Sequence, residues 1–159
     1  MTGSGRILVV EDDDMLRETL RDVFEDEGHE VRTAVHGADA FETLAVWEPT
    51  VIVLDLMMPV MDGVEFRERQ HRDGIAQGAK ILILSAARHL DQAAKHVAAD
   101  AYLAKPFHLK EVLRVVDEFC QTRIRGAANA EVRRVEPLTR QPASPDPGDG
   151  EPMGRVSDL

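Results

Sequence analysis

Short runs of apolar residues recur along this chain, and each run stops at a polar residue. The runs cover residues 7–10, 51–54, 81–84 and 101–104, and they are followed by Glu11 and Asp12, by Asp55, by Ser85 and by Lys105. Runs of this length are typical of strands that are buried on both faces of a parallel sheet. If these strands are neighbours, their carboxyl ends bring the polar residues into one crevice, where open α/β sheets bind ligands.

Helical patterns fill the intervals between the runs. They cover residues 14–27, a stretch after Gly37 that ends before Pro49, and residues 63–72, 91–98 and 109–124, of which the Ala-rich 91–98 is the weakest pattern. Residues 30–35 alternate in polarity, which favours a strand toward a sheet edge. Alternating strands and helices predict right-handed crossovers and an α/β fold, with a five-stranded parallel sheet flanked by five helices.

The composition changes near residue 125. Residues 6–124 hold all the expected strands and helices, whereas five of the eight prolines fall between residues 137 and 152. We therefore expect one domain over residues 1–125 and a disordered Pro- and Gly-rich tail over residues 126–159. A tail of this size and composition is too short to bury a core of its own.

The charge and the apolar content of the chain limit its class of function. A net charge of −10 repels phosphate backbones and gives no support to direct nucleic-acid binding. Cys120 is the only cysteine, which excludes an internal disulfide, and the first residues lack the apolar stretch of a secretory signal. No apolar run approaches the roughly 18 residues of a membrane span. We expect a cytoplasmic protein without membrane insertion.

Three carboxylates are expected at the strand ends. Glu11, Asp12 and Asp55 would lie close together if the first and third strands are adjacent. Two like charges about 4 Å apart repel by roughly 4 kcal/mol at an effective dielectric near 20. The cluster should therefore take up a proton or hold a hard divalent cation, and Mg²⁺ suits oxygen ligands of this kind.

Asp55 is the expected nucleophile of this crevice. It follows the central apolar strand and precedes a loop, residues 56–63, that can present backbone groups to a phosphoryl unit. A carboxylate that attacks phosphorus forms an aspartyl phosphate. Lys105, the Ser85 hydroxyl and a cation could neutralise the phosphoryl oxygens during the transfer.

Four spaced motifs resemble the receiver domain of bacterial two-component response regulators. They are Val-Val-Glu11-Asp12-Asp13, Leu-Asp55-Leu-Met-Met-Pro59-Val-Met-Asp62-Gly63, Leu-Ser85-Ala86 and Tyr102-Leu-Ala-Lys105-Pro106-Phe107. The motifs agree in order, and the resemblance covers about residues 6–124. It implies the flavodoxin-like fold with strand order 2-1-3-4-5.

The resemblance also implies a role for each acidic residue. Asp55 would accept the phosphoryl group, and Glu11 and Asp12 would form the acidic pair that binds Mg²⁺ together with Asp55. The backbone carbonyl of Met57 would be a further ligand.

The remaining site residues would bind the phosphoryl group or respond to it. Lys105 would contact that group. Ser85, followed by Ala86, resembles the switch hydroxyl of the family, and Tyr102 resembles the switch aromatic that turns inward as the hydroxyl moves.

The resemblance implies a signalling phosphoacceptor and not an enzyme, and the short tail predicts that it is of the single-domain type. Its phosphoryl group would come from a phosphohistidine on a sensor histidine kinase or a histidine phosphotransfer protein. The fourth helix, fifth strand and fifth helix would pass the signal to an unknown downstream protein. The span from Ser85 to Lys105 is two residues shorter than is usual in the family, so the segment that includes the fourth helix is trimmed.

Two other interpretations remain open. Asp12-Asp13-Asp14 contains an Asp-x-Asp pattern, which would suit a small magnesium-dependent phosphatase with an aspartyl nucleophile. That hypothesis leaves Asp55 unexplained, and acidic residues at positions 13 and 14 also favour the start of a helix. The chain could instead be an unphosphorylated interaction module, against which the complete set of acidic residues and Lys105 argues.

Overall fold

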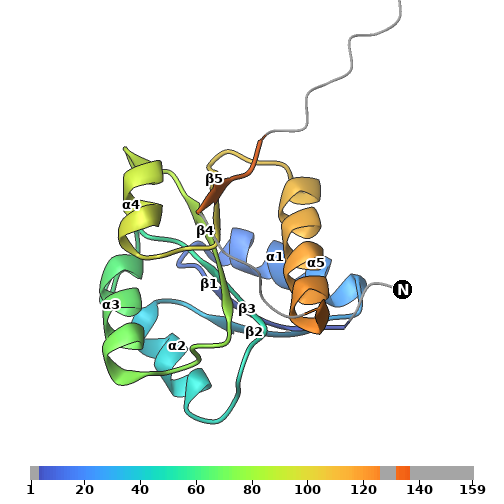
Figure 1. Ribbon diagram of the computed structural model, residues 1–159, viewed down its shortest axis with the longest axis horizontal. Helices are drawn as coiled ribbons and strands as arrows, with labels where there is room; N and C mark the ends of the chain where they lie inside the picture. Colours follow the sequence, from blue (N-terminus) through green and yellow to red (C-terminus); the bar gives the residue numbers. More distant parts are fainter. Residues whose placement is uncertain (1–3, 126–131, 137–159) are drawn as a thin grey trace, which may run out of the picture.

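The computed structural model describes residues 4–125 and 132–136, and it has a parallel sheet with helices on both faces (Figure 1). In these residues the strand order is β2-β1-β3-β4-β5-β6, and all neighbouring pairs are parallel. The strands are β1 (Arg6–Val10), β2 (Glu30–Ala34), β3 (Val51–Leu54), β4 (Lys80–Ser85), β5 (Ala101–Ala104) and β6 (Arg133–Arg134). The predicted flavodoxin-like order 2-1-3-4-5 is confirmed, with a short sixth strand added.

Within the described residues, five helices cover the sheet. They are α1 (Asp14–Asp26), α2 (Gly37–Leu44), α3 (Gly63–Asp73), α4 (Leu90–His96) and α5 (Leu109–Arg125). Figure 1 shows α1 and α5 on one face and α2, α3 and α4 on the other. The predicted helical intervals are confirmed, and the weakest pattern corresponds to α4, which has seven residues and no side-chain hydrogen bond at its N-cap.

Alternate residues of the strands enter two apolar clusters. Ile7 and Val9 pack on the α1 and α5 side, whereas Leu8 and Val10 pack on the α2, α3 and α4 side. This follows from the alternation of side chains along a strand, and it explains why the central strands read as continuous apolar runs. Burying one such side chain contributes about 1.5–3 kcal/mol, so the two clusters hold the sheet and its carboxyl edge in place.

Two aspartates cap the N-termini of α1 and α3, the helices that start next to the carboxyl edge. The Oδ1 of Asp13 accepts from the Leu16 amide at 2.8 Å, and the Oδ1 of Asp62 accepts from the Glu65 amide at 2.9 Å. Such N-caps stabilise a helix by about 1 kcal/mol. They set where α1 and α3 begin, close behind the site residues of β1 and β3.

The strand β6 lies in the stretch that the sequence assigned to a disordered tail. The Arg133 amide donates to the Asp100 carbonyl and the Val135 amide to the Tyr102 carbonyl, both at 3.1 Å. Val135 is 5% exposed and packs in the apolar cluster on the α1 and α5 side of the sheet. For residues 132–136 the tail prediction is therefore corrected, because backbone pairing with a free strand edge needs no periodic pattern. The rest of the predicted tail lies outside the described residues.

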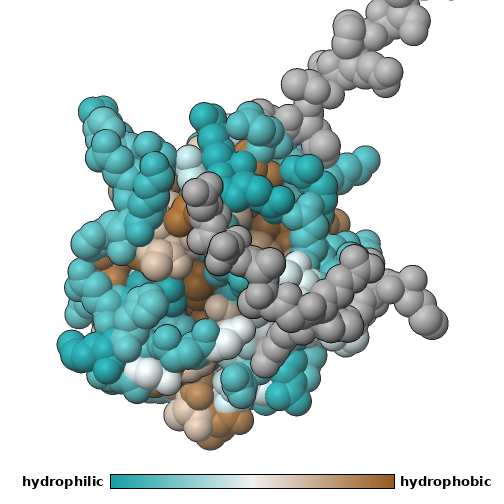
Figure 2. All heavy atoms as spheres, viewed as in Figure 1, coloured by the Kyte–Doolittle hydropathy of each residue, from teal (hydrophilic) through white to brown (hydrophobic). Residues whose placement is uncertain are grey.

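The surface is mainly polar in the view of Figure 2, where hydrophilic residues cover the outer sides of α3 and α4 and apolar residues appear between the elements. None of the helices in the described part of the chain combines the length and the apolar character that a membrane span requires.

Candidate functional site

The parallel pairing of β1 with β3 brings two buried carboxylates to one edge. Glu11 and Asp55 directly follow these strands, whose last residues Val10 and Leu54 are register partners. The Asp55 amide donates to the Val10 carbonyl at 3.0 Å and the Glu11 amide to the Ala34 carbonyl at 3.1 Å. The backbone therefore holds both residues on the sheet, and their side chains extend beyond its carboxyl edge.

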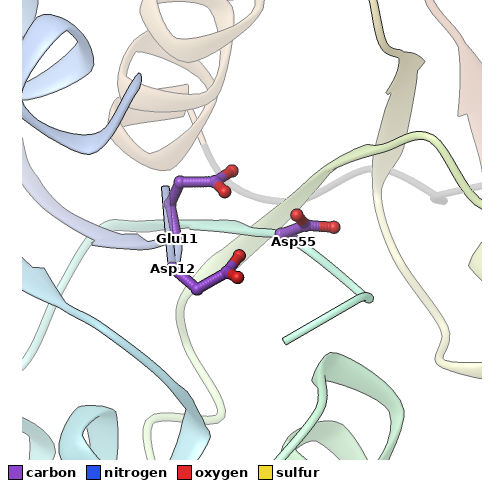
Figure 3. A group of neighbouring side chains, drawn as sticks. All are labelled: Glu11, Asp12 and Asp55. Carbon is purple, nitrogen blue, oxygen red and sulfur yellow. The ribbon is translucent and has the colours of Figure 1, made fainter. Parts of the chain in front are cut away.

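Glu11, Asp12 and Asp55 form an acidic cluster (Figure 3). Each offers a carboxylate oxygen, and these oxygens all lie within 4.8 Å of one another. Glu11 and Asp55 are 2% and 5% exposed, whereas Asp12 faces solvent. Oxygen ligands at this spacing, with one side open, suit a divalent cation that keeps some of its waters.

Lys105 lies across the acidic cluster. Its Nζ donates to Glu11 Oε2 at 2.8 Å and to Asp55 Oδ2 at 2.9 Å. Its own amide donates to the Ser85 carbonyl at 3.0 Å, which holds the end of β5 beside the end of β4. Three carboxylates and one ammonium leave a formal charge of −2, the charge that a divalent cation neutralises.

The electrostatics of the cluster follow from its burial. Burial raises the pKa of Glu11; the Lys105 hydrogen bond opposes this, and the charge of Asp55 adds to it. Burial by itself would lower the pKa of Lys105, but the hydrogen bonds and charges of Glu11 and Asp55 outweigh it, so its pKa is raised. Glu11 thus ionises less readily than a free glutamate, and Lys105 stays charged.

Asp55 is held in a fixed orientation. Its Oδ1 accepts from the Met57 amide at 3.0 Å, while its Oδ2 takes the Lys105 bond. The following loop folds back tightly, because a Cβ on Gly63 would meet the Asp55 carbonyl oxygen at 2.4 Å. Only glycine permits this approach. Met57, whose carbonyl was predicted as a metal ligand, lies in this loop with a side chain that is 60% exposed.

Ser85 and Tyr102 lie on the same face of the sheet. Ser85 ends β4 and is fully buried, and its Oγ accepts from the Ala87 amide at 3.3 Å. Tyr102 is the register partner of Ile83, two residues before Ser85, and is 9% exposed in the cluster under α4. The predicted switch pair is therefore brought together on adjacent strands.

Ala86 marks the opening beside Lys105. It is exposed and lines, with Lys105, Pro106 and Phe107, a surface cavity of about 600 Å³ that reaches α1 at Leu16. The predicted site residues of β1, β3, β4 and β5 thus gather at one end of the sheet.

The structure separates Asp14 from the acidic cluster. Its Oδ1 pairs with the guanidinium of Arg17 at 2.5 Å, and its side chain is 86% exposed. The Asp-x-Asp interpretation therefore lacks its second carboxylate at the site.

Sequence analysis missed Arg17. This residue is 8% exposed, and its Nη1 donates to the backbone carbonyl of Glu11 at 2.9 Å. It braces the backbone from which Glu11 and Asp12 extend. The available signal was its position three residues before the buried Leu20, on the inner side of α1.

The comparisons with known proteins agree with this geometry. The family described as "Response regulator receiver domain" matches residues 7–117. The response regulator MprA of Mycobacterium tuberculosis is 38% identical over 144 residues, which cover 89% of this chain and 62% of MprA. MprA of Mycobacterium ulcerans is 40% identical over 112 residues, which cover 69% of this chain and 47% of that protein. The chain thus spans less than two thirds of the length of these curated relatives.

Solved structures give the same result. The response regulator TrrA of Thermotoga maritima, solved in complex with Mg²⁺ and BeF, is 31% identical with a TM-score of 0.62, over 72% of this chain and 97% of that chain. The chemotaxis response regulator CheY4 of Vibrio cholerae is 29% identical with a TM-score of 0.67, over 73% of this chain and 98% of that chain.

Proposed function

We propose that this chain, which belongs to the response regulator receiver domain family, accepts a phosphoryl group on Asp55 with the help of Mg²⁺ and signals through a change in protein contacts. Receiver domains are signalling phosphoacceptors and not catalytic enzymes, and histidine kinases generally phosphorylate them. The observation that carries the proposal is the Lys105 ammonium bound to both Asp55 and Glu11 within the acidic cluster.

The proposed reaction is a transfer between a phosphohistidine and Asp55. An Asp55 carboxylate oxygen forms a bond to phosphorus, the phosphorus–nitrogen bond breaks, and the imidazole nitrogen takes up a proton. The orientation of Asp55 by the Met57 amide and by Lys105 supports this assignment. Held in place by two hydrogen bonds, the carboxylate loses little entropy on reaching the attacking geometry.

The acidic cluster is the proposed metal site. Glu11, Asp12 and Asp55 would bind Mg²⁺, with the Met57 carbonyl as a further ligand, and the formal charge of −2 supports a divalent ion. When bound, such an ion neutralises charge on the phosphoryl oxygens and lowers their repulsion of the carboxylate. Lys105 would move from Glu11 to the new oxygens, since Glu11 then has the cation as its partner.

Exposed apolar residues beside the cluster support a protein as the phosphoryl donor. Met15 and Met57 are 81% and 60% exposed and lie in the segments that follow Glu11 and Asp55, and Val60 in the same loop is 79% exposed. Together with Phe107 and Leu16 of the neighbouring cavity they offer an apolar rim around a charged site. A sensor histidine kinase or a histidine phosphotransfer protein could bury this rim.

The proposed output starts at Ser85 and ends at the surface of α4, β5 and α5. The phosphoryl group carries about −1.5 to −2 charges in place of the single charge of the Asp55 carboxylate, and its oxygens attract the Ser85 hydroxyl and Lys105. Tyr102, on the same face as Ser85, would respond and alter the packing of α4. The downstream partner would be a protein that recognises this surface. We also propose a cytoplasmic location.

An intact-mass experiment tests the proposal. The full chain is incubated with Mg²⁺ and acetyl phosphate, and its mass should increase by one acid-labile phosphoryl group. Asp55→Asn should abolish the increase. Asp62→Asn is the matched control, because Asp62 caps α3 in the following loop and asparagine is an equally good cap. A full mass increase in Asp55→Asn would refute the assignment.

A further inference from the structure

A second polar cavity lies at the opposite end of the sheet from Asp55. It has a volume of about 330 Å³ and is enclosed by α3, the α3–β4 loop, the start of β4 and the α4–β5 loop. Its charged lining residues are Arg67, Lys80 and Asp100, joined by His71. We call this the Arg67 cavity. Its size is at the lower end of the range for small-molecule sites.

Arg67 is a buried cation whose hydrogen bonds all go to neutral groups. Its side chain extends from α3 and is 5% exposed. Its Nε donates to the Val97 carbonyl at 3.0 Å, its Nη2 to the Ala98 carbonyl at 3.3 Å, and its Nη1 to the amide oxygen of Gln70. In the described part of the chain no carboxylate pairs with this guanidinium. A buried charge without a counter-ion is unfavourable, so an anion that pairs with Arg67 would stabilise the folded protein.

Arg67 also contacts the imidazole of His71. The Nη2 of Arg67 lies 2.9 Å from His71 Nε2. Because a guanidinium can only donate, Nε2 accepts this hydrogen bond, and an imidazole has no negative charge with which to balance Arg67.

The one carboxylate that lines the Arg67 cavity is already engaged. Asp100 Oδ1 accepts from Lys80 Nζ at 2.9 Å, and its Oδ2 accepts from the Ile81 amide at 2.8 Å. Asp100 thus balances Lys80, and the charge of Arg67 remains. Burial lowers the pKa of Arg67, and Asp100 opposes this only from a distance. The net charge of −10 repels anions from most of the surface, whereas the surplus positive charge of this cavity attracts them.

We propose that the Arg67 cavity binds a small anion with carboxylate or phosphate oxygens, which accept from the guanidinium of Arg67 and the ammonium of Lys80. Four of the five guanidinium N–H groups of Arg67 donate to Val97, Gln70, Ala98 and His71, which leaves one N–H on Nη1 for a charge-assisted bond to an oxygen of the anion. Lys80 is the more exposed of the two cations, at 24% of its side chain, and lies where a ligand would enter.

Binding here would act on the part of the fold that carries the proposed output. Arg67 donates to the carbonyls of Val97 and Ala98, immediately after α4, and so ties α3 to the end of that short helix. Strand β4 also runs from Lys80 at the Arg67 cavity to Ser85 at the acidic cluster. An anion that accepts hydrogen bonds from Arg67 and Lys80 would therefore shift the positions of α4 and β4. It would do so from the end of the sheet opposite to Asp55. The anion site itself does not depend on phosphorylation of Asp55.

Nuclear magnetic resonance titration of the full chain tests the site. Citrate and inorganic pyrophosphate are the probes, in magnesium-free buffer at constant ionic strength, with chloride as the reference salt. We expect saturable shifts in the amides of residues 77–81 and 97–100 in response to at least one probe. Lys80→Gln should weaken the binding about tenfold or more, because it removes one charge-assisted partner and leaves Asp100 unbalanced.

The control is Arg69→Gln, which removes one positive charge as Lys80→Gln does and lies on α3, the helix that carries Arg67. Arg69 stacks on Phe41 and pairs with Asp73, away from the Arg67 cavity. Its loss should leave the affinity unchanged. Shifts that rise linearly with both probes, or an equal affinity in Lys80→Gln and Arg69→Gln, would refute the proposal. Lys80→Gln keeps the hydrogen bonds from Arg67 to the Val97 and Ala98 carbonyls, which follow α4. A loss of binding in this variant is therefore not caused by a disturbed α4.

Discussion

The ammonium of Lys105 lies 2.8 Å from a carboxylate oxygen of Glu11, a residue 94 positions earlier in the chain. This contact joins the end of β5 to the end of β1 across the site, with β3 and β4 between them in the sheet. Glu11 is also a proposed ligand of Mg²⁺. Lysine and cation therefore compete for one carboxylate, and the charge of Lys105 is available to a phosphoryl group only when the cation has taken its place.

Lys105→Met should raise the affinity for Mg²⁺. Lys105 contacts two of the proposed metal ligands, and unit charges about 4 Å apart interact by about 1–4 kcal/mol, so removing this positive charge should raise the affinity roughly fivefold or more. Isothermal titration calorimetry with MgCl₂ measures this. Lys110→Met on the exposed side of α5 is the control for a change in net charge. An unchanged Mg²⁺ affinity in Lys105→Met would contradict the competition.

Glu11→Gln should change how stability depends on pH. Since the folded-state pKa of Glu11 lies above 4.5, the folded protein binds this proton more tightly than the unfolded chain. The stability that protonated Glu11 contributes is therefore present below pH 4.5 and is lost as the pH rises through the raised pKa.

Urea unfolding in magnesium-free buffer at several pH values tests this expectation. The difference in unfolding free energy, Glu11→Gln minus wild type, should become more positive as the pH rises through that window. A difference that is constant with pH would show that Glu11 ionises normally in the folded protein.

Met57→Asn should shorten the lifetime of phosphorylated Asp55. The exposed Met57 side chain follows Asp55 by two residues and would limit the approach of water to a phosphoryl group on Asp55, whereas an amide would hold a water molecule near the phosphorus. The decay of the acid-labile mass after removal of the phosphodonor gives the rate, which should rise severalfold. Leu56 and Met58 are buried and make poor controls; Val60→Asn, an exposed position in the same loop, is the matched one. Equal decay in wild type and Met57→Asn would contradict the shielding role.

Val60→Asn should itself stabilise the protein. Val60 has φ 68° and is 79% exposed, so a β-branched residue occupies a left-handed conformation with little packing in return. Asparagine tolerates this conformation better, and the gain should be about 1 kcal/mol in the free energy of unfolding. Thermal and urea unfolding measure it. A loss of stability would mean that the Val60 side chain makes contacts that outweigh the strain.

Val135→Ala should destabilise the chain by about 1–2 kcal/mol, because Val135 is buried against α5 although it lies beyond the last helix. Arg134→Ala, on an exposed residue of the same strand, should have little effect. Urea unfolding of the two variants separates the outcomes. If both variants match wild type, β6 adds nothing to the stability of the fold.

The sheet and its acidic edge were predictable because they depend on local patterns and one general rule. The runs that end at Glu11, Asp55, Ser85 and Lys105 identify buried strands, and parallel pairing then collects their carboxyl ends. The partners within the edge were not predictable. Three carboxylates of similar type lie near Lys105, and only the fold decides that it bridges Glu11 and Asp55 and leaves Asp12 toward solvent.

Other contacts had no readable signal in the sequence. Arg67 occupies an inward position of α3 where a charged residue breaks the apolar pattern, and its partners, Val97 and Ala98, are backbone groups 30 and 31 residues away. Backbone acceptors have no residue type to search for. The pairing of β6 with β5 has the same character, since it depends on two main-chain hydrogen bonds and one valine.

The strand β6 bears on how this protein is handled in the laboratory. A fragment that stops at Arg125, the last residue of α5, would leave the outer edge of β5 with unpaired carbonyl groups at Asp100 and Tyr102. Free strand edges recruit other chains and promote aggregation. Expression fragments that extend to at least residue 136 should therefore remain monodisperse at concentrations where shorter ones associate.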